Sequence, residues 1–283
     1  MSILEQLRAA KIFTPSEEAL AAFILSNPNK AFRLTLRELA ESSFVSKPTI
    51  IRLYRKIGFE SYSDFRIAYF SETRGDSKEV LDFNLPFRKN ESVIDITTSI
   101  CNLTKQIVDN NLKALDQDNL NQIVNVLFES NRIFLFAIGD SMIQAQAFHN
   151  KLVKLDIYTY LINEFGDTLA NIYNMEEDDC ILVISFSGIT FQDNDRSVRA
   201  IAQSKAKSII LSSMNPRDIP FQFDYYMRLV GEEDRFEKIG TFSSQIAINY
   251  ALNLLYSCIY EKEYENNRKY NQKYVTFINN VYK

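Results

Sequence analysis

Hydrophobic and polar positions divide the chain into two regions with different periodicity. Between residues 3 and 73 the apolar residues recur only at helical spacing. Thr14-Pro15-Ser16-Glu17 and Thr35-Leu36-Arg37-Glu38 each combine an N-cap threonine with a glutamate three residues later, an arrangement that begins many helices. From Arg74 to Glu91 the pattern breaks at Gly, Asp, Pro and Asn residues. We therefore expect an all-helical N-terminal region and then an exposed connector with at most one short helix.

Beyond the connector, long helices give way to short apolar runs. Two helices are expected between Val93 and Phe128, divided near Asp116–Asp118. The short runs predict strands at Arg132–Ile138, Ile157–Ile162, Cys180–Ser185, Ser208–Leu211 and Tyr225–Leu229. Amphipathic stretches predict helices at Met142–Lys154, Thr168–Tyr173, Asn194–Gln203 and Ser244–Tyr260. Because apolar strands alternate with helices, the expected fold class is α/β: an all-α N-terminal domain, then an α/β/α sandwich around a five-stranded parallel sheet.

Residues Leu34 to Ile57 have the pattern of a helix-turn-helix. A first helix is followed by a turn at Ser42–Val45 and by a second helix that Ser46 caps and Gly58 ends. Apolar residues of the second helix fall on one stripe, and its outer face suits the major groove of DNA. The expected DNA contacts are Ser46, Lys47, Thr49, Arg52, Arg55 and Lys56. Lys47, Thr49 and Arg52 would reach base edges, and the last two the phosphates. A small helical bundle with a solvated charged face would show the same spacing.

The distribution of charge agrees with DNA binding by the N-terminal region. The 283-residue chain has a net charge of −4, but residues 1–75 carry 11 Lys and Arg against 8 Asp and Glu, a net +3. The remaining residues carry 21 against 28, a net −7. The three cysteines are far apart and form no C-x-x-C pair, which favours a reducing cytoplasm. No export signal and no apolar stretch of about 18 residues is present, so no membrane partner is expected.

A strand that runs into a hydroxyl-rich turn is the candidate ligand site. The turn is Ser185-Phe186-Ser187-Gly188-Ile189-Thr190. Its three hydroxyls can donate hydrogen bonds, Gly188 lets the backbone approach closely, and the N–H groups of the following helix favour an anion. Gly139-Asp140-Ser141 follows the first strand and would reach the same sheet edge, where parallel sheets bind ligands. The two turns predict a phosphate site, and an ordinary strand–helix connection is the alternative.

Two blocks of the sequence resemble known families. The N-terminal region resembles the DNA-binding domain of the RpiR family of bacterial regulators in the motifs Phe13-Thr14-Pro15-Ser16-Glu17, Leu39-Ala40-Glu41, Val45-Ser46-Lys47-Pro48-Thr49-Ile50-Ile51-Arg52-Leu53, Lys56-Ile57-Gly58-Phe59 and Tyr62-Ser63-Asp64-Phe65. Roughly residues 120–260 resemble a SIS (sugar isomerase) domain in the Ser-x-Ser-Gly-x-Thr turn, the earlier Gly-x-Ser turn and Ser243-Ser244. In RpiR regulators the SIS domain follows the helix-turn-helix and binds a phosphorylated sugar, and the order here is the same.

The resemblance implies a set of ligand residues. They are Gly139, Ser141, Ser185, Ser187, Gly188, Thr190 and Ser244. Three positions depart from the family pattern: Phe44 replaces a glycine in the turn, Ala137 replaces the first glycine of Gly-x-Gly-x-Ser, and Gln245 stands where an arginine is frequent. With the periodicity, the resemblance gives a helix-turn-helix domain at 1–74, a linker at 75–91, a SIS domain at 92–262 and a C-terminal helix or tail at 263–283.

The expected function is a transcriptional regulator of carbohydrate metabolism whose binding to operator DNA is modulated by a phosphorylated sugar or amino sugar. A homodimer or homotetramer is expected, because two-fold operators favour paired recognition helices. The helices at Ser244–Tyr260 and between Val93 and Phe128 are the candidate assembly surfaces. A sensor whose N-terminal helices dock a protein is one alternative. A sugar-phosphate isomerase is the other.

An isomerase needs a base that moves a proton between adjacent carbons, and the chain offers few. Its only histidine, His149, lies in an apolar stretch and is expected to be structural. Glu164 and Glu237 are possible bases near strand ends, and Asp140 is a polar ligand contact at most. One histidine and scattered cysteines do not make a metal site. We therefore expect no enzymatic activity, no metal and no cofactor.

Overall fold

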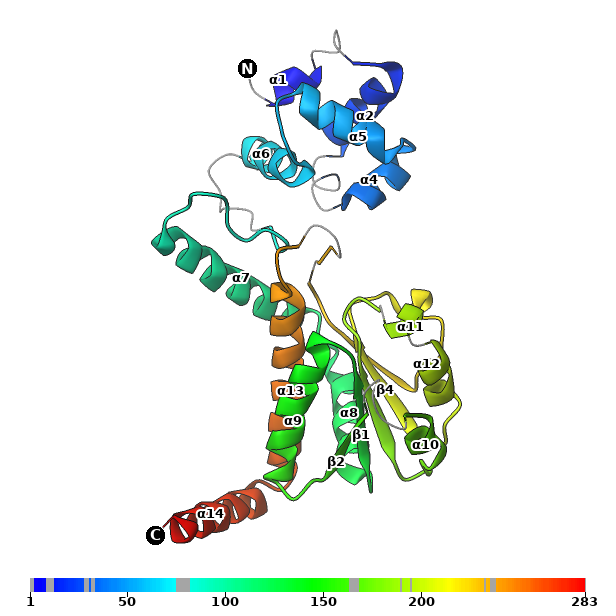
Figure 1. Cartoon of the computed structure of the whole chain (residues 1–283), viewed down its shortest axis with the longest axis vertical. Coiled ribbons are helices and arrows are strands. Elements are labelled where there is room, and N and C mark those ends of the chain that lie inside the picture. The colour runs from blue at the N-terminus through cyan, green and yellow to red at the C-terminus, as the bar shows by residue number, and fades with distance from the viewer. Residues whose placement is uncertain are drawn as a thin grey trace. The chain divides into compact units, whose positions relative to one another are not determined.

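The chain forms two compact units in a computed structural model (Figure 1). The first comprises residues 1–100 and 234–239, and the second comprises residues 101–233 and 240–283. The boundary between them falls inside α7 (Val93–Lys113). The structure describes residues 3–8, 13–27, 31, 34–74, 82–162, 168–188, 190–193, 195–231, 233–234 and 238–282.

Capped amphipathic helices build the first unit. They are α1 (Ile3–Arg8), α2 (Pro15–Ser26), α4 (Leu36–Ser43), α5 (Lys47–Lys56) and α6 (Tyr62–Arg74). The backbone N–H of Thr14 donates to Glu17 Oε2 at 2.8 Å, and that of Thr35 donates to Glu38 Oε2 at 2.8 Å, so both predicted helix starts are confirmed. The apolar faces meet in a core whose fully buried members include Leu20, Ile24, Leu39, Ile50, Leu53 and Tyr69.

The turn between α4 and α5 depends on a left-handed residue. Phe44 has φ 54° and ψ 36°, a conformation that glycine adopts without steric cost. Its N–H donates to the Ala40 carbonyl and closes α4, and its side chain is 96% exposed. The helix-turn-helix therefore keeps its turn geometry at the position where the family glycine is missing, at the cost of backbone strain.

The prediction of an exposed connector is wrong for residues 82–84. Asp82, Phe83 and Asn84 are buried within the first unit. The Ser63 hydroxyl donates to the Asp82 carboxylate, and Arg66 Nη2 lies 3.9 Å from it. Sequence periodicity missed these contacts because they join residues that are far apart along the chain.

A parallel sheet organises the second unit. Its strands are β1 (Ile133–Ala137), β2 (Thr159–Ile162), β3 (Cys180–Ile184), β4 (Lys207–Ser212) and β5 (Tyr225–Arg228), in the order β2-β1-β3-β4-β5. All neighbouring strands are parallel. The predicted five-stranded parallel sheet is confirmed. The sequence could predict it because strands that are buried on both faces form continuous apolar runs.

Helices cover both faces of this sheet. They are α8 (Gln117–Glu129), α9 (Asp140–Val153), α10 (Thr168–Tyr173), α11 (Thr190–Asp193), α12 (Asp195–Ala202) and α13 (Phe242–Lys262), with a 3-10 turn at Pro216–Asp218. Figure 1 shows α8, α9 and α13 on one side, and α10, α11 and α12 on the other. Phe134, Val183 and Ile210 pack with Val198 and Ile201 on the second side. The helical turn of α11 was not predicted, since Thr190 had been assigned to a loop.

The chain closes with α14 (Tyr264–Val281), in the stretch whose sequence permitted either a helix or a tail. None of its residues is buried. Across the part of the chain that the structure describes, no helix combines the length and hydropathy needed to cross a membrane.

Candidate functional site

Four of the six predicted DNA contacts, Lys47, Arg52, Arg55 and Lys56, are exposed on α5, whereas the prediction that Thr49 reaches base edges is wrong because Thr49 is buried. Ser46 is the N-cap of this helix, and its hydroxyl lies 2.8 Å from the Thr49 hydroxyl. Thr49 is only 4% exposed, whereas Ser46 is exposed and its side chain accepts a hydrogen bond from the Thr49 N–H as the cap of the helix. The structure thus presents basic side chains to solvent, uses the Ser46 hydroxyl as the cap and binds the Thr49 hydroxyl to Ser46 and Arg52.

Arg52 and Lys56 share a buried partner on α2 that sequence reasoning had treated only as a capping residue. Glu17 has 0% of its surface exposed. Lys56 Nζ donates to Glu17 Oε2 at 2.6 Å, and Arg52 Nε lies 3.6 Å from Glu17 Oε1. Burial raises the pKa of Glu17, but hydrogen bonds from Lys56 and Thr14 outweigh it and hold the pKa below its ordinary value. The carboxylate is therefore charged at neutral pH.

The predicted ligand turn lies at the carboxyl end of β3. Ser185 is 2% exposed and its hydroxyl donates to Thr190 Oγ1 at 2.8 Å, which ties the two ends of the turn together. Ser187, between them, is exposed. Gly188 has φ 74°, and a Cβ there would lie 1.8 Å from Met214 Sδ, so any other residue would strain the backbone and displace the Met214 side chain.

The turn after β1 reaches the same edge. Ala137 pairs with Ile184 across β1 and β3, so Gly139 and Ser185 follow neighbouring strand ends. Gly139 adopts φ 57° and ψ −134° as the N-cap of α9, and Ser141 is half-buried in the first turn of that helix. The structure thus places the two predicted turns at one sheet edge, as the sequence had indicated.

A third loop, between β5 and α13, also lies at this edge. The sequence had indicated only Glu237 within it and Ser243-Ser244 at the start of the helix that follows. Thr241 Oγ1 donates to Asp140 Oδ2 at 2.7 Å, which joins the loop to the start of α9. Glu233 Oε1 accepts the N–H of Ser244 at 2.7 Å, at the start of α13. The first N–H groups of this 21-residue helix have no acceptor within the helix and attract anions. Here the Glu233 carboxylate is the anion that accepts one of them. No local motif marks Glu233, because it lies eleven residues before its partner.

The same loop touches the β3 turn. A Cβ on Gly231 would lie 2.9 Å from Phe186 Cζ and 2.4 Å from Ser243 Oγ. Ser243 is fully buried, and its hydroxyl has no hydrogen-bond partner among the described residues. Three loops therefore meet at the carboxyl edge of the sheet. They present hydroxyls and helix N–H groups that can hold a phosphate, and carboxylates that can accept hydrogen bonds from sugar hydroxyls.

The structure shows the surroundings of two departures from the family pattern, Gln245 and Ala137. Gln245 Oε1 accepts from Gln144 Nε2 at 3.0 Å, so a neutral contact between α13 and α9 stands where an arginine is frequent. Ala137 is the last residue of β1 and is fully buried.

Of the candidate bases, the structure describes His149, and it lies away from this edge. His149 Nδ1 is hydrogen-bonded to Thr159 Oγ1, at the start of β2 and hence at the opposite edge of the sheet. Glu164 and Glu237 lie outside the described residues.

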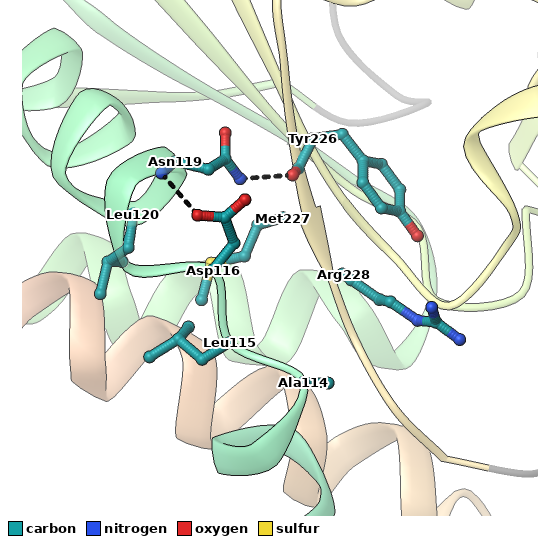
Figure 2. A pocket seen from close by; sticks show the side chains of 8 residues that line it. All are labelled: Ala114, Leu115, Asp116, Asn119, Leu120, Tyr226, Met227 and Arg228. Atoms are coloured by element: carbon teal, nitrogen blue, oxygen red, sulfur yellow. Dashed lines mark hydrogen bonds between the residues drawn. The ribbon is translucent and has the colours of Figure 1, made fainter.

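A cavity of about 200 Å³ lies elsewhere in the second unit, between the α7–α8 turn and β5 (Figure 2). It is lined by Ala114, Leu115, Asp116, Asn119, Leu120, Tyr226, Met227 and Arg228. Asn119 Nδ2 donates to the Tyr226 carbonyl at 2.7 Å and holds α8 against the strand. None of the predicted ligand residues lines this cavity, so it is separate from the three-loop edge.

Comparisons with known proteins match both units. Residues 1–74 match the model of the helix-turn-helix domain of the rpiR family, and residues 126–256 match the model of the SIS domain. An uncharacterised HTH-type transcriptional regulator of Clostridium perfringens is 26% identical over 256 residues, covering 90% of this chain and 91% of the relative. The HTH-type transcriptional regulator HexR of Escherichia coli is 23% identical over 243 residues, covering 81% of this chain and 82% of HexR.

Among solved structures, the NanR protein of Vibrio vulnificus complexed with ManNAc-6P has the same fold, with a TM-score of 0.59 and 18% identity over 98% of each chain. The fold, the recognition helix and the sheet edge together define a helix-turn-helix transcriptional regulator with a SIS sensor domain. The chain belongs to the RpiR family of these regulators. Both resemblances stated from the sequence are confirmed.

Proposed function

We propose that a phosphorylated sugar or amino sugar binds at the three-loop edge and modulates DNA binding. Ser185, Ser187 and Thr190 hold the phosphate, and Gly188 lets the backbone N–H groups approach it. Gly139, Ser141 and Ser244 complete the site from the neighbouring loops. The observation that carries the proposal is the convergence of these loops through the Thr241–Asp140 contact and the packing of Gly231 on Phe186. The ManNAc-6P complex of NanR supports the class of ligand.

The site is proposed to sense its ligand without converting it. Proton transfer between adjacent carbons needs a base within hydrogen-bond reach of the substrate. His149 lies at the opposite end of the strands, and this supports the structural role expected for it. Hydroxyls and a helix N-terminus bind a phosphate reversibly, which suits a sensor of a metabolite whose concentration changes.

On the DNA side, we propose that Lys47 and Arg52 contact base edges and that Arg55 and Lys56 contact phosphates. Ser46 and Thr49 contribute by shaping the start of α5, since they bond to each other and Thr49 is buried. We propose that DNA binding lies in residues 1–74 and the sensor in 92–262, with 75–91 connecting them although residues 82–84 are buried in the first unit. The protein is proposed to act in the cytoplasm, where bacterial operators lie.

We propose a homodimer or homotetramer, because one helix-turn-helix buries too little surface for specific affinity and two-fold operators engage two recognition helices. Exposed apolar side chains on α7, Val93 at 81% and Ile94 at 69%, support an assembly surface among the helices predicted for that role.

The connector offers a route by which the ligand can influence the DNA-binding unit. Asn84 Oδ1 accepts the Asp234 N–H at 2.6 Å, and the Asn84 carbonyl accepts the Ile239 N–H at 3.1 Å. Asp234 directly follows Glu233, which caps α13 in the ligand loop. The Asn84 N–H donates in turn to Asp82 Oδ1 at 2.8 Å, and Asp82 is bonded to α6. Ligand binding that displaces Glu233 would therefore move Asp234 and disturb the contacts of Asn84 and Asp82 in the first unit.

Thermal-shift measurements with a panel of phosphorylated sugars and amino sugars test the proposal. A specific ligand stabilises the protein by about 2.7 kcal/mol at a hundred times its Kd. Ser187→Glu puts a carboxylate where the phosphate would bind, and we expect it to abolish the stabilisation. Ser204→Glu, at a half-exposed site outside the three loops, is the control and should retain it. A ligand-dependent shift that survives Ser187→Glu would place the ligand elsewhere, and turnover of any of these sugars would favour an isomerase.

A further inference from the structure

A fully buried carboxylate lies beneath the outer face of the recognition helix. Glu17 belongs to α2, and its two cationic partners belong to α5, 35 and 39 residues further along the chain. Lys56 Nζ lies 2.6 Å from Oε2 and Arg52 Nε lies 3.6 Å from Oε1. Glu17 therefore connects two of the side chains that are proposed to contact DNA.

The capping of α2 does not by itself explain this burial. Glu38 performs the same capping role at Thr35, at the start of α4, and it does so while exposed. Burying a carboxylate costs several kcal/mol unless cations and hydrogen bonds compensate, so a capping glutamate gains nothing by leaving the surface. What distinguishes Glu17 from Glu38 is the pair of cations from α5.

The contacts of Arg52 show what the carboxylate does. Arg52 Nη2 donates to Thr49 Oγ1 at 3.1 Å, and Thr49 is held by the Ser46 hydroxyl at 2.8 Å. Glu17 faces Nε on the same guanidinium. Thr49 accepts a hydrogen bond from one nitrogen, and the Glu17 carboxylate attracts another across 3.6 Å without a hydrogen bond, while 57% of the side chain stays exposed. An arginine that is held before binding loses less conformational entropy when it pairs with a base.

We propose that Glu17 is a positioning residue for DNA recognition: it orients the Arg52 guanidinium for base reading and reduces the contribution of Lys56 to phosphate neutralisation. The proposal rests on the proposed DNA contacts of Arg52 and Lys56. Base contacts carry sequence information, and phosphate contacts do not. Glu17 thus raises specificity and lowers affinity for DNA of arbitrary sequence.

This role predicts effects of opposite sign for two DNA duplexes. Glu17→Gln keeps the size of the side chain and its ability to cap α2, but removes the negative charge. Affinity for a specific duplex should fall about tenfold, the size expected for losing one bidentate arginine–base pair. Affinity for a non-specific duplex should stay the same or rise, because Lys56 is released to phosphate. The salt dependence of non-specific binding should steepen by about one unit of slope.

The test uses the full-length protein and a duplex that it selects from a random-sequence library, with a scrambled duplex as the non-specific probe. Binding is measured by fluorescence anisotropy from low to physiological salt. Glu38→Gln is the matched control, since it makes the same change in an exposed capping glutamate, and it should alter neither affinity by more than about twofold. Arg52→Ala and the double variant complete a cycle in which Glu17→Gln should cause no further loss of specificity once Arg52 is absent.

Several results would overturn the proposal. A structural defect would lower both affinities in parallel, and an unchanged ratio of specific to non-specific affinity would remove the positioning role. A full effect of Glu17→Gln in the Arg52→Ala background would show that it does not act through Arg52. If Glu17→Gln fails to fold, Arg52→Lys tests the same geometry from the other partner, because it keeps the charge and loses Nε. If the wild-type protein selects no sequence and binds no DNA, the proposed DNA contacts themselves are wrong. That outcome is distinct from a failure of the positioning role alone, in which the wild-type protein still binds DNA.

Discussion

Phe44→Gly should stabilise the helix-turn-helix, although it deletes the whole side chain. An L-residue with a Cβ pays about 1–2 kcal/mol in the left-handed region, and glycine pays none. Glycine also adds about 0.5–1 kcal/mol of entropy to the unfolded chain, which offsets part of the gain. The Phe44 side chain is 96% exposed, so its removal sacrifices little packing. The net stabilisation is therefore about 0.5–1 kcal/mol.

Native-state hydrogen exchange measures this gain within the full-length protein. Amides of Leu39 and Leu53, in the core on either side of the turn, should exchange about two- to fivefold more slowly in the glycine variant. Phe44→Ala is the control: it removes the same exposed ring but keeps the Cβ, so it should leave the rates nearly unchanged. Equal slowing by alanine and glycine would show that the ring, not the backbone, is the source of strain. Faster exchange in Phe44→Gly would refute the reasoning.

Two further predictions concern the connector and the sheet. Asn84→Ala should leave ligand-induced thermal stabilisation intact while the ligand's effect on DNA affinity shrinks, because the side-chain contact to the Asp234 N–H is lost and only the backbone contact to Ile239 remains. Lys89→Ala, exposed in the same connector, should preserve that effect in the same anisotropy assay. Burial raises the pKa of Asp179, but hydrogen bonds from Arg132 and the Glu176 N–H hold it below its ordinary value. Since the folded pKa is depressed, this stabilisation is present above the unfolded pKa of about 4 and is lost as pH falls through the folded pKa. Urea titrations should show a shallower loss of stability below pH 4 for Asp179→Asn than for the wild type, and identical slopes would contradict this assignment.

Local chemistry made much of the fold predictable. Thr14 and Thr35 mark helix starts because the groups that cap a helix lie within three residues of each other. The run Cys180–Ser185 predicts a buried parallel strand because both of its faces must be apolar. Ser185, Gly188 and Thr190 could be proposed as ligand residues because a single turn contains the hydroxyls and the glycine.

The sequence by itself determined most of the helical and strand segments, the turn at the end of β3 and the family, but neither α11 nor the helical state of α14. The tertiary structure decided what depends on partners far apart along the chain, namely the capping of α13 by Glu233 and the burial of the connector at Asp82. It also showed that Phe44 adopts the left-handed conformation. The structure changed the interpretation of the recognition helix as well, whose Thr49 is buried and whose Arg52 forms an ion pair with the buried Glu17. Capping and periodicity act over one or two turns, whereas burial and ion pairing depend on which segments the fold brings together.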